Sequence, residues 1–213
     1  MASSQSQAAP MRPRIGVFGG AFDPPHRTHL DLARAALAQA DLAELRIFPT
    51  GQAWHKARTL SSAPERLAMA RLAFAEVPGA VVDAREIERD GPTYTLDTLR
   101  ELQAERPDAQ LVLMMGTDQA RALPSWHGWQ EILSIAIVLI AARANPAGAA
   151  GQFDPHSLPG LPPAARFEFL HVTPVDTSAT DIRTRASRGE DISSLVPLPV
   201  ARYIEQHHLY RPA

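Results

Sequence analysis

The pattern of apolar and polar residues along this chain alternates between two periods. Short apolar runs that are bounded by Gly, Pro or polar residues predict buried strands. We expect strands at Arg14–Phe18, Leu45–Phe48, Leu111–Met115, Ile135–Ile140 and Phe167–Val172, and a short extended segment at Val81–Ile87.

Apolar positions three and four residues apart predict one-sided helices between these strands. The clearest helix start is Ser62, which can form a capping box with Glu65 and has Pro64 inside the first turn. The predicted helices cover Leu30–Leu37, Ser62–Val77, Leu96–Leu102, Ala179–Arg188 and Val200–His207. Because helices separate the strands, we predict an α/β fold: a single domain with a doubly wound parallel sheet and a small C-terminal helical part.

Three segments stand apart from this alternation. Residues 1–13 are rich in Ser, Gln and Ala and lack the apolar core of a signal peptide, so we expect a disordered leader before a domain that spans 14–211. The segment Asn145–Pro163 is rich in Pro and Gly and predicts a surface loop, the stretch most prone to disorder. The most apolar run, Ile132–Ala142, is too short to cross a bilayer and is interpreted as a buried strand. No membrane partner is expected.

Composition narrows the class further. With 213 residues, 45% of them hydrophobic, the chain can form one α/β domain with a substantial core. A net charge of -2 and the lack of a Lys/Arg run argue against a nucleic-acid partner. The chain has no cysteine, so it has no disulfide and no thiolate metal site, which is compatible with a cytoplasmic location. The oligomeric state stays open, a homo-oligomer included.

The strongest chemical signal is G-G-A-F-D-P-P-H-R-T-H, from Gly19 to His29. It follows a predicted strand and leads into a predicted helix, and its glycines let the backbone turn tightly and approach a ligand closely. His26 and His29 then lie at the helix entrance. In isolation, such a pair could also be a metal pair or simply polar residues that begin a helix. Zinc is disfavoured because no further ligands stand at metal spacing.

A second signal is T-S-A-T-D-I-R, from Thr177 to Arg183. Ser178 and Thr180 place hydroxyls near the start of a predicted helix, and Arg183 follows one turn later, an arrangement suited to phosphate oxygens. Both hydroxyls could also be ordinary helix N-caps, but capping leaves Arg183 unexplained. Together the two segments predict a site for a nucleoside triphosphate.

The two segments resemble the G-x-F-x-P-x-H-x-G-H and I-S-S-T-x-I-R elements of the nucleotidylyltransferase superfamily. Between them, G-P-T-Y-T (Gly91 to Thr95), M-G-T-D (Met115 to Asp118) and P-S-W-H (Pro124 to His127) narrow the resemblance to bacterial nicotinate-nucleotide adenylyltransferases. The ending Y-I-E-Q-H-H-L-Y (Tyr203 to Tyr210) narrows it in the same way. The resemblance runs from about Arg14 to Arg211.

The resemblance implies a Rossmann-like nucleotidylyltransferase fold and the transfer of AMP from ATP to nicotinate mononucleotide, with release of pyrophosphate, as in NAD biosynthesis. It implies that His26, His29 and Arg183 are catalytic, and that Mg²⁺ binds mainly through the ATP phosphates rather than to dedicated metal ligands. The implied ATP-binding residues are Gly19, Gly20, Ala21, Phe22, His26, His29, Asp118, Ser178, Thr180 and Arg183. The implied residues for nicotinate mononucleotide are Asp23, His55, Lys56, Thr95, Asp118, Trp126, His127 and Arg143.

Several of these residues also have a plain structural interpretation. Asp23 could form the turn before Pro24, Asp118 could cap a helix, and Trp126 could be a core or surface aromatic residue. Lys56 and Arg143 could be solvated charges.

The chain also departs from the family pattern. Thr28 stands where Gly is usual, Ala21 where Thr is frequent, Thr177 where Ile is common and Ala179 where Ser is common. A β-branched Thr28 disfavours positive φ, so either the position does not need it or the turn is altered. Two alternatives stay open: an adenylyltransferase for another acceptor, such as phosphopantetheine, which would share the phosphate-binding residues, and a catalytically silent nucleotide-binding regulator, which the departures at Thr28 and Ala21 make conceivable.

Overall fold

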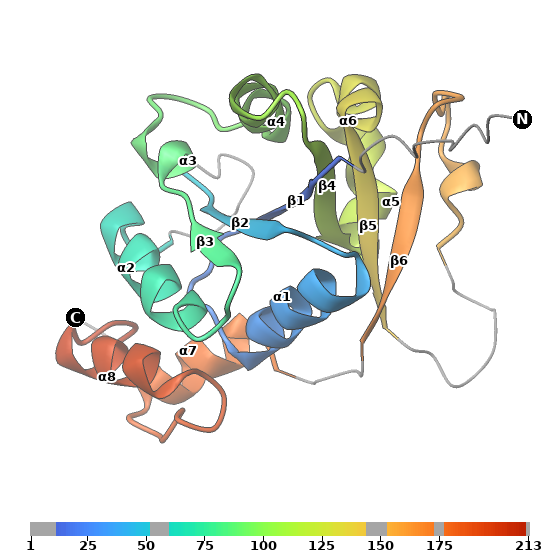
Figure 1. The fold of residues 1–213 in the computed structure, drawn as a ribbon. Helices are drawn as coiled ribbons and strands as arrows, with labels where there is room; N and C mark the ends of the chain where they lie inside the picture. Colours follow the sequence, from blue (N-terminus) through green and yellow to red (C-terminus); the bar gives the residue numbers. More distant parts are fainter. Residues whose placement is uncertain (1–11, 52–59, 144–152, 173–176, 212–213) are drawn as a thin grey trace, which may run out of the picture.

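The computed structural model describes residues 12–51, 60–143, 153–172 and 177–211 of the chain. Its centre is a six-stranded sheet in the order β3-β2-β1-β4-β5-β6, in which every neighbouring pair is parallel (Figure 1). Helices cover both faces, so the predicted doubly wound, Rossmann-like fold is confirmed. Parallel strands that are buried on both faces account for the continuous apolar runs of the sequence.

The strands and helices alternate along the chain. The strands are β1 (Arg14–Gly20), β2 (Glu44–Pro49), β3 (Ala80–Val82), β4 (Gln110–Gly116), β5 (Ala136–Arg143) and β6 (Phe167–Val172). The α-helices are α1 (Arg27–Gln39), α2 (Ala63–Phe74), α3 (Arg85–Glu88), α4 (Thr95–Glu105), α5 (Thr117–Ala122), α6 (Trp129–Ile135), α7 (Ala179–Ser187) and α8 (Leu198–Gln206). Two short 3-10 helices, η1 (Leu123–Ser125) and η2 (Pro155–Ser157), complete the described part.

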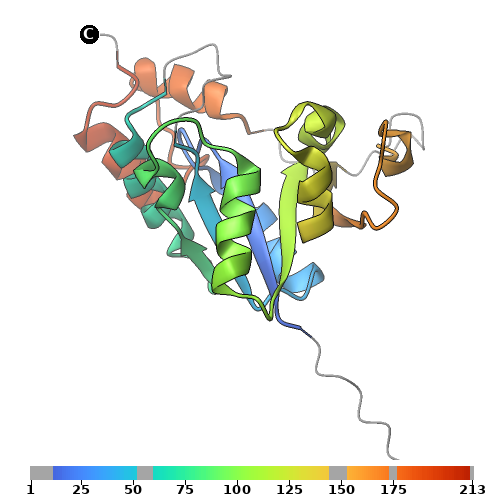
Figure 2. The same ribbon diagram turned by 90° about the horizontal axis from the view of Figure 1, so that it is seen from above.

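Two apolar cores lie on opposite faces of the sheet. Phe18, Val112 and Met114 pack with α1, α2 and the C-terminal helices, whereas Val17 and Leu113 pack with α4 and α6. Figure 2 shows the helices on both sides of the strands. This division follows from the alternation of side chains along each strand.

The strand order changes direction between β1 and β4, at the centre of the sheet. The first three strands run outward from β1 to β3, and the last three run outward from β4 to β6. In such sheets, ligands bind beyond the carboxyl ends of the strands at this reversal. Gly20 and Gly116 end β1 and β4, so the loops that follow them flank the expected ligand position.

Two predicted segments are wrong in part. The stretch Val81–Ile87, expected to be extended, is strand only in β3 and then becomes the short helix α3. The apolar run Ile132–Ala142, interpreted as one strand, is divided between α6 and β5. Ile132 and Leu133 are buried by the helix instead, since an apolar run by itself does not distinguish a buried helix from a buried strand. The helices α5 and α6 were not expected.

Only the latter part of Asn145–Pro163 is described. Residues 153–163 contain the short helix η2, and Phe153 and Leu158 are buried against the core on the α4 and α6 side of the sheet. This part is therefore packed onto the domain. No helix in the described ranges is long and apolar enough to span a membrane.

Candidate active site

The loop after β1 carries the first sequence signal. A side chain at Gly19 would meet no atom within 4 Å, so the backbone is open there, whereas one at Gly20 would come within 3.1 Å of the Phe22 ring. Phe22 has φ of 47°, in the left-handed region, and its ring is buried. The ring makes edge-on contacts with Phe18, Phe74 and His29, at centroid distances of 5.5, 5.4 and 5.1 Å. The loop is thus anchored in the core while its glycines stay accessible.

His26 and His29 lie together at the start of α1, as predicted from their spacing. His26 is the N-cap residue, and its backbone N–H donates to Nδ1 of His29 at 3.2 Å. The two rings are 3.8 Å apart between centroids. Because Nδ1 of His29 accepts this hydrogen bond, a neutral His29 carries its proton on Nε2, which is then a donor.

Both histidines are neutral over the physiological pH range. Burial lowers the pKa of His26 to about 4. Burial and the neighbouring His26 lower the pKa of His29 well below its ordinary value. In the free protein, the pair therefore offers N–H donors and no positive charge.

Thr28 lies inside α1 and is absent from the described residues with positive φ. The position usually held by Gly therefore does not need the left-handed conformation in this chain. Its Oγ1 is buried and has no hydrogen-bond partner among the described residues.

The second sequence signal forms the start of α7 and meets the first. Ser178 is the N-cap, and its Oγ accepts from the Asp181 N–H at 3.1 Å. Arg183 donates to Oγ1 of Thr180 at 2.9 Å and to the backbone carbonyl of Asp23 at 2.9 Å. The latter bond joins two segments that are 160 residues apart in the chain.

The Asp23 carboxylate is 2% exposed and is held inside the protein. The hydroxyl of Tyr210 donates to its Oδ1 at 2.7 Å, and the Ser61 N–H donates to Oδ2 at 3.2 Å. Burial raises the pKa of Tyr210, and the charge of Asp23 raises it further. In the sequence, Tyr210 stands out only as part of the family-like ending, because nothing near it in the chain indicates Asp23 as its partner.

A second buried residue that the sequence did not predict is the cation Arg66. Arg66 in α2 is 2% exposed and donates to three backbone carbonyls, those of Ser61, Ala21 and Gly51, at 3.1, 3.0 and 3.3 Å. The sequence shows it only as one charged residue near a helix start.

Three of the residues expected to bind the acceptor, Thr95, Trp126 and His127, lie where α4 and α6 begin. Thr95 is the first residue of α4, so its N–H has no carbonyl four residues earlier in the helix to donate to. Trp126 and His127 lie between η1 and α6, and the His127 ring packs against the Tyr94 ring at a tilt of 37°, with 4.6 Å between centroids. Among the described residues, no hydrogen bond uses the Thr95 or the His127 amide. A side chain at Gly128, where φ is 62°, would come within 2.3 Å of Leu96, so this turn packs closely onto α4.

The other residues predicted to bind the acceptor lie elsewhere in the fold or are not fully described. Asp118 lies in the first turn of α5, directly after β4, and is exposed and within 3.7 Å of Arg121. Arg143 is the last residue of β5, and only its backbone is described. His55 and Lys56 lie outside the described residues.

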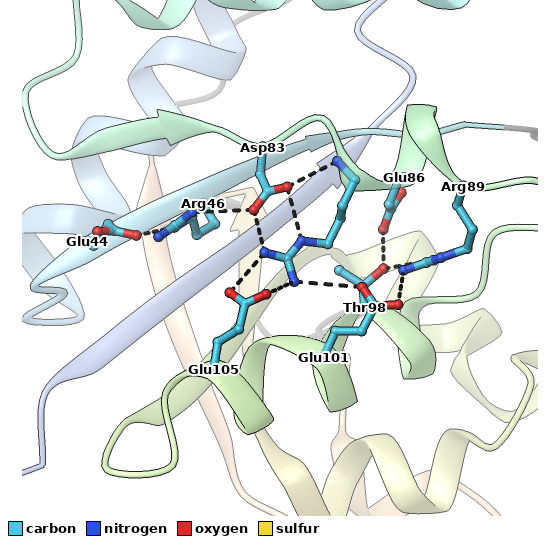
Figure 3. Close-up of polar contacts among 9 residues, drawn as sticks. Glu44, Arg46, Asp83, Glu86, Arg89, Thr98, Glu101 and Glu105 are labelled. Carbon is cyan, nitrogen blue, oxygen red and sulfur yellow. Dashed lines mark hydrogen bonds and ion pairs between the residues drawn. The ribbon is translucent and has the colours of Figure 1, made fainter.

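A polar network links β2, the segment after β3, α3 and α4 (Figure 3). Arg85 forms paired contacts with Asp83 and with Glu105, and Arg46 bridges Glu44 and Asp83. Glu86 and Thr98 are its buried members: Oε1 of Glu86 accepts from the Thr98 hydroxyl at 2.8 Å, and burial raises the pKa of Glu86 to about 7. The backbone carbonyl of Glu86 would lie 1.9 Å from a side chain at Gly51, so the two segments touch.

The described residues contain no group of three or more His, Cys, Asp or Glu side chains that could hold a metal ion. The donor set at the carboxyl ends of β1 and β4 instead consists of imidazole N–H groups, backbone amides, hydroxyls and a guanidinium. These groups suit a bound anion whose counter-ion, such as a metal ion, comes with the anion rather than being held by protein ligands.

Comparison with known proteins shows the family to which the chain belongs. The sequence matches the cytidylyltransferase-like family over residues 17–194. A relative from Albidiferax ferrireducens, named a probable nicotinate-nucleotide adenylyltransferase, is 56% identical and covers 94% of this chain and 99% of its own. A second, from Methylibium petroleiphilum and with the same name, is 44% identical and covers 96% and 95%.

Solved structures share the fold. A Plasmodium falciparum nicotinic acid mononucleotide adenylyltransferase complexed with NaAD matches with a TM-score of 0.72 at 16% identity, over 93% of this chain and 97% of that one. The same enzyme complexed with APC matches with a TM-score of 0.71.

The fold and the family match define a nucleotidyltransferase, and the chain belongs to the cytidylyltransferase-like family. Within this family, identities of 56% and 44% over nearly the full length of the chain show that it belongs to the nicotinate-nucleotide adenylyltransferases. The resemblance seen in the sequence is confirmed.

Proposed function

We propose that this enzyme transfers the adenylyl group of ATP to the phosphate of nicotinate mononucleotide, forming nicotinate adenine dinucleotide and pyrophosphate. The observation that carries the proposal is the bond from Arg183 to the Asp23 carbonyl. It brings the hydroxyl and guanidinium donors of α7 to the loop that presents His26 and His29. The relatives' names supply the acceptor.

In the proposed reaction, an oxygen of the nucleotide phosphate attacks the α-phosphorus of ATP, and the bond to the β-phosphate oxygen breaks. A phosphate monoester has a second pKa near ~6 and is mostly dianionic at neutral pH, so a general base adds little. Catalysis then depends on position and on stabilisation of charge. His29 is suited to this task because its Nε2–H is fixed as a donor by the bond to Nδ1.

The leaving pyrophosphate would be held by Ser178, Thr180 and Arg183, with help from backbone amides at Gly20 to Phe22. Nη2 of Arg183 already donates a hydrogen bond to the Thr180 hydroxyl, so the two groups are close enough to bind one anion together. Mg²⁺ bound through the ATP phosphates would neutralise part of their charge.

For the acceptor, we propose that Trp126 stacks on the nicotinate ring and that its carboxylate accepts from the amides of Thr95 and His127. The first amide belongs to the N-terminus of an 11-residue helix, where an anion is favoured. Asp118 would lie near the nucleotide sugars, and His55, Lys56 and Arg143 near the acceptor. We also propose a cytoplasmic location, with which the cysteine-free sequence is compatible.

The two alternatives are less well supported. A phosphopantetheine acceptor would not explain the G-P-T-Y-T and P-S-W-H segments, and a silent regulator would not need His26, His29 and Arg183 together. The test is pyrophosphate release from ATP and Mg²⁺ with nicotinate mononucleotide or phosphopantetheine as acceptor. We expect rapid release with the first and little with the second. Equal release with phosphopantetheine, or none with either acceptor, would overturn the proposal.

A further inference from the structure

We propose that Arg66 is a positioning residue for nucleotide transfer: it orients the peptide between Ala21 and Phe22 so that the Phe22 N–H faces the ATP phosphates. This inference rests on the proposed function, and the acceptor plays no part in it.

The position of Arg66 is unfavourable for a cation in two ways. Its side chain is buried, and it lies in the first turns of α2, where the helix dipole is positive. The other buried residues of this helix are apolar: Met69, Ala70, Ala73 and Phe74. A leucine would serve the packing of this face, so the contacts made by the guanidinium explain its presence.

Those contacts join three separate segments. Nε donates to Ser61 just before α2, Nη1 to Ala21 in the loop after β1, and Nη2 to Gly51 after β2. A guanidinium presents its donors in one rigid plane, so the three carbonyls are fixed relative to one another. Ser61 extends the same network, because its N–H donates to the Asp23 carboxylate.

The bond to Ala21 determines where the next amide points. In a planar trans peptide, the C=O and the following N–H point in opposite directions. Since the Ala21 carbonyl faces Arg66, the Phe22 N–H faces away from it. No acceptor for this N–H exists among the described residues. Phe22 also keeps a left-handed φ of 47°, which needs support from the surroundings.

The inference can be tested by replacing Arg66 with methionine, which keeps the buried stem and removes the donors. We expect ATP binding, measured by calorimetry with Mg²⁺ and without acceptor, to weaken by about tenfold or more, the scale of lost charged hydrogen bonds. The KM for nicotinate mononucleotide should change by less than about twofold, a split that general loss of structure would not produce. The matched control is Arg71→Met, an exposed arginine on the same helix, which should bind ATP like the wild type.

Arg66→Lys keeps the charge but cannot span three carbonyls, so it should give an intermediate loss. If Arg66→Met does not fold, hydrogen exchange of the wild type replaces it: pyrophosphate should slow exchange of the Phe22 amide. A folded Arg66→Met that binds ATP normally, or a Phe22 amide that pyrophosphate does not protect, would overturn the inference. A wild type that binds ATP but transfers no adenylyl group would overturn the proposed function alone.

Discussion

The hydroxyl of Tyr210 donates a 2.7 Å hydrogen bond to the carboxylate of Asp23, 187 residues earlier in the chain. The bond fixes the segment after α8 to the loop after β1, beside the Asp23 carbonyl that Arg183 holds. The C-terminal helical part therefore holds the loop after β1 at one residue, Asp23, through both its side chain and its backbone carbonyl.

Tyr210→Phe removes this donor and leaves the buried carboxylate less well satisfied. We expect the free energy of unfolding to fall by about 1–3 kcal/mol. Urea denaturation measures the change. Tyr203→Phe on α8 is the control, because its ring stacks on His207 and no hydrogen bond of its hydroxyl is found in the described residues. Equal stability of Tyr210→Phe and wild type would show that the bond contributes nothing.

His29→Asn separates the two roles of this histidine. The Asn carbonyl can still accept from the His26 N–H, but the Nε2–H donor is lost. We expect kcat to fall by about 10²-fold or more while the melting temperature stays near that of the wild type. A folded variant with nearly normal kcat would remove His29 from the mechanism.

His26 and His29 should both be neutral at pH 7 in the free protein. Because burial lowers the pKa of His26 to about 4, and burial together with His26 lowers the pKa of His29 well below its ordinary value, neither ring should carry a positive charge at pH 7. NMR titration of the ring signals, assigned with the His29→Asn variant, measures this in the free protein. A His29 signal with its midpoint near pH 6.5 would contradict the structure.

Glu86 should make stability depend on pH. Its pKa rises from 4.5 to about 7 on folding, so its contribution is fully present below pH 4.5 and is lost as the pH rises through 7. The loss amounts to about 3 kcal/mol at most. Glu86→Gln keeps an acceptor for Thr98 and cannot ionise, so it should be more stable than the wild type at pH 8 and not at pH 5. Glu88→Gln, an exposed change on α3, is the control for thermal unfolding at both values. Equal effects of Glu86→Gln at both pH values would refute this assignment.

The nicotinate carboxylate should be distinguished from its amide by main-chain donors. A carboxylate only accepts, whereas an amide also presents N–H groups to the Thr95 and His127 amides. We expect kcat/KM to favour the acid by roughly 10²-fold. Thr95→Ala and His127→Ala should keep most of this preference, and Trp126→Ala should weaken both nucleotides through lost stacking. A collapse of selectivity in either of the first two variants would show that side chains read the ring substituent.

The sequence predicted those parts of the candidate site whose residues lie close together in the chain. The succession of strand, loop and helix predicted that His26 and His29 lie at a helix entrance. The predicted start of a second helix placed Ser178 and Arg183 one turn apart. Arg66, Tyr210 and Glu86 could not be predicted, because their partners are carbonyls and side chains that only the tertiary fold brings near. The division of Ile132–Ala142 was also hidden, since its apolar residues are buried in either structure.

The central claim is that ATP is attacked at its α-phosphorus by the phosphate of nicotinate mononucleotide. Phosphorus NMR of a mixture of the enzyme, ATP, Mg²⁺ and this nucleotide tests it directly. We predict that the dinucleotide and pyrophosphate appear together in equal amounts as ATP and the acceptor disappear. Formation of ADP and phosphate without dinucleotide, or an unchanged spectrum, would contradict the account.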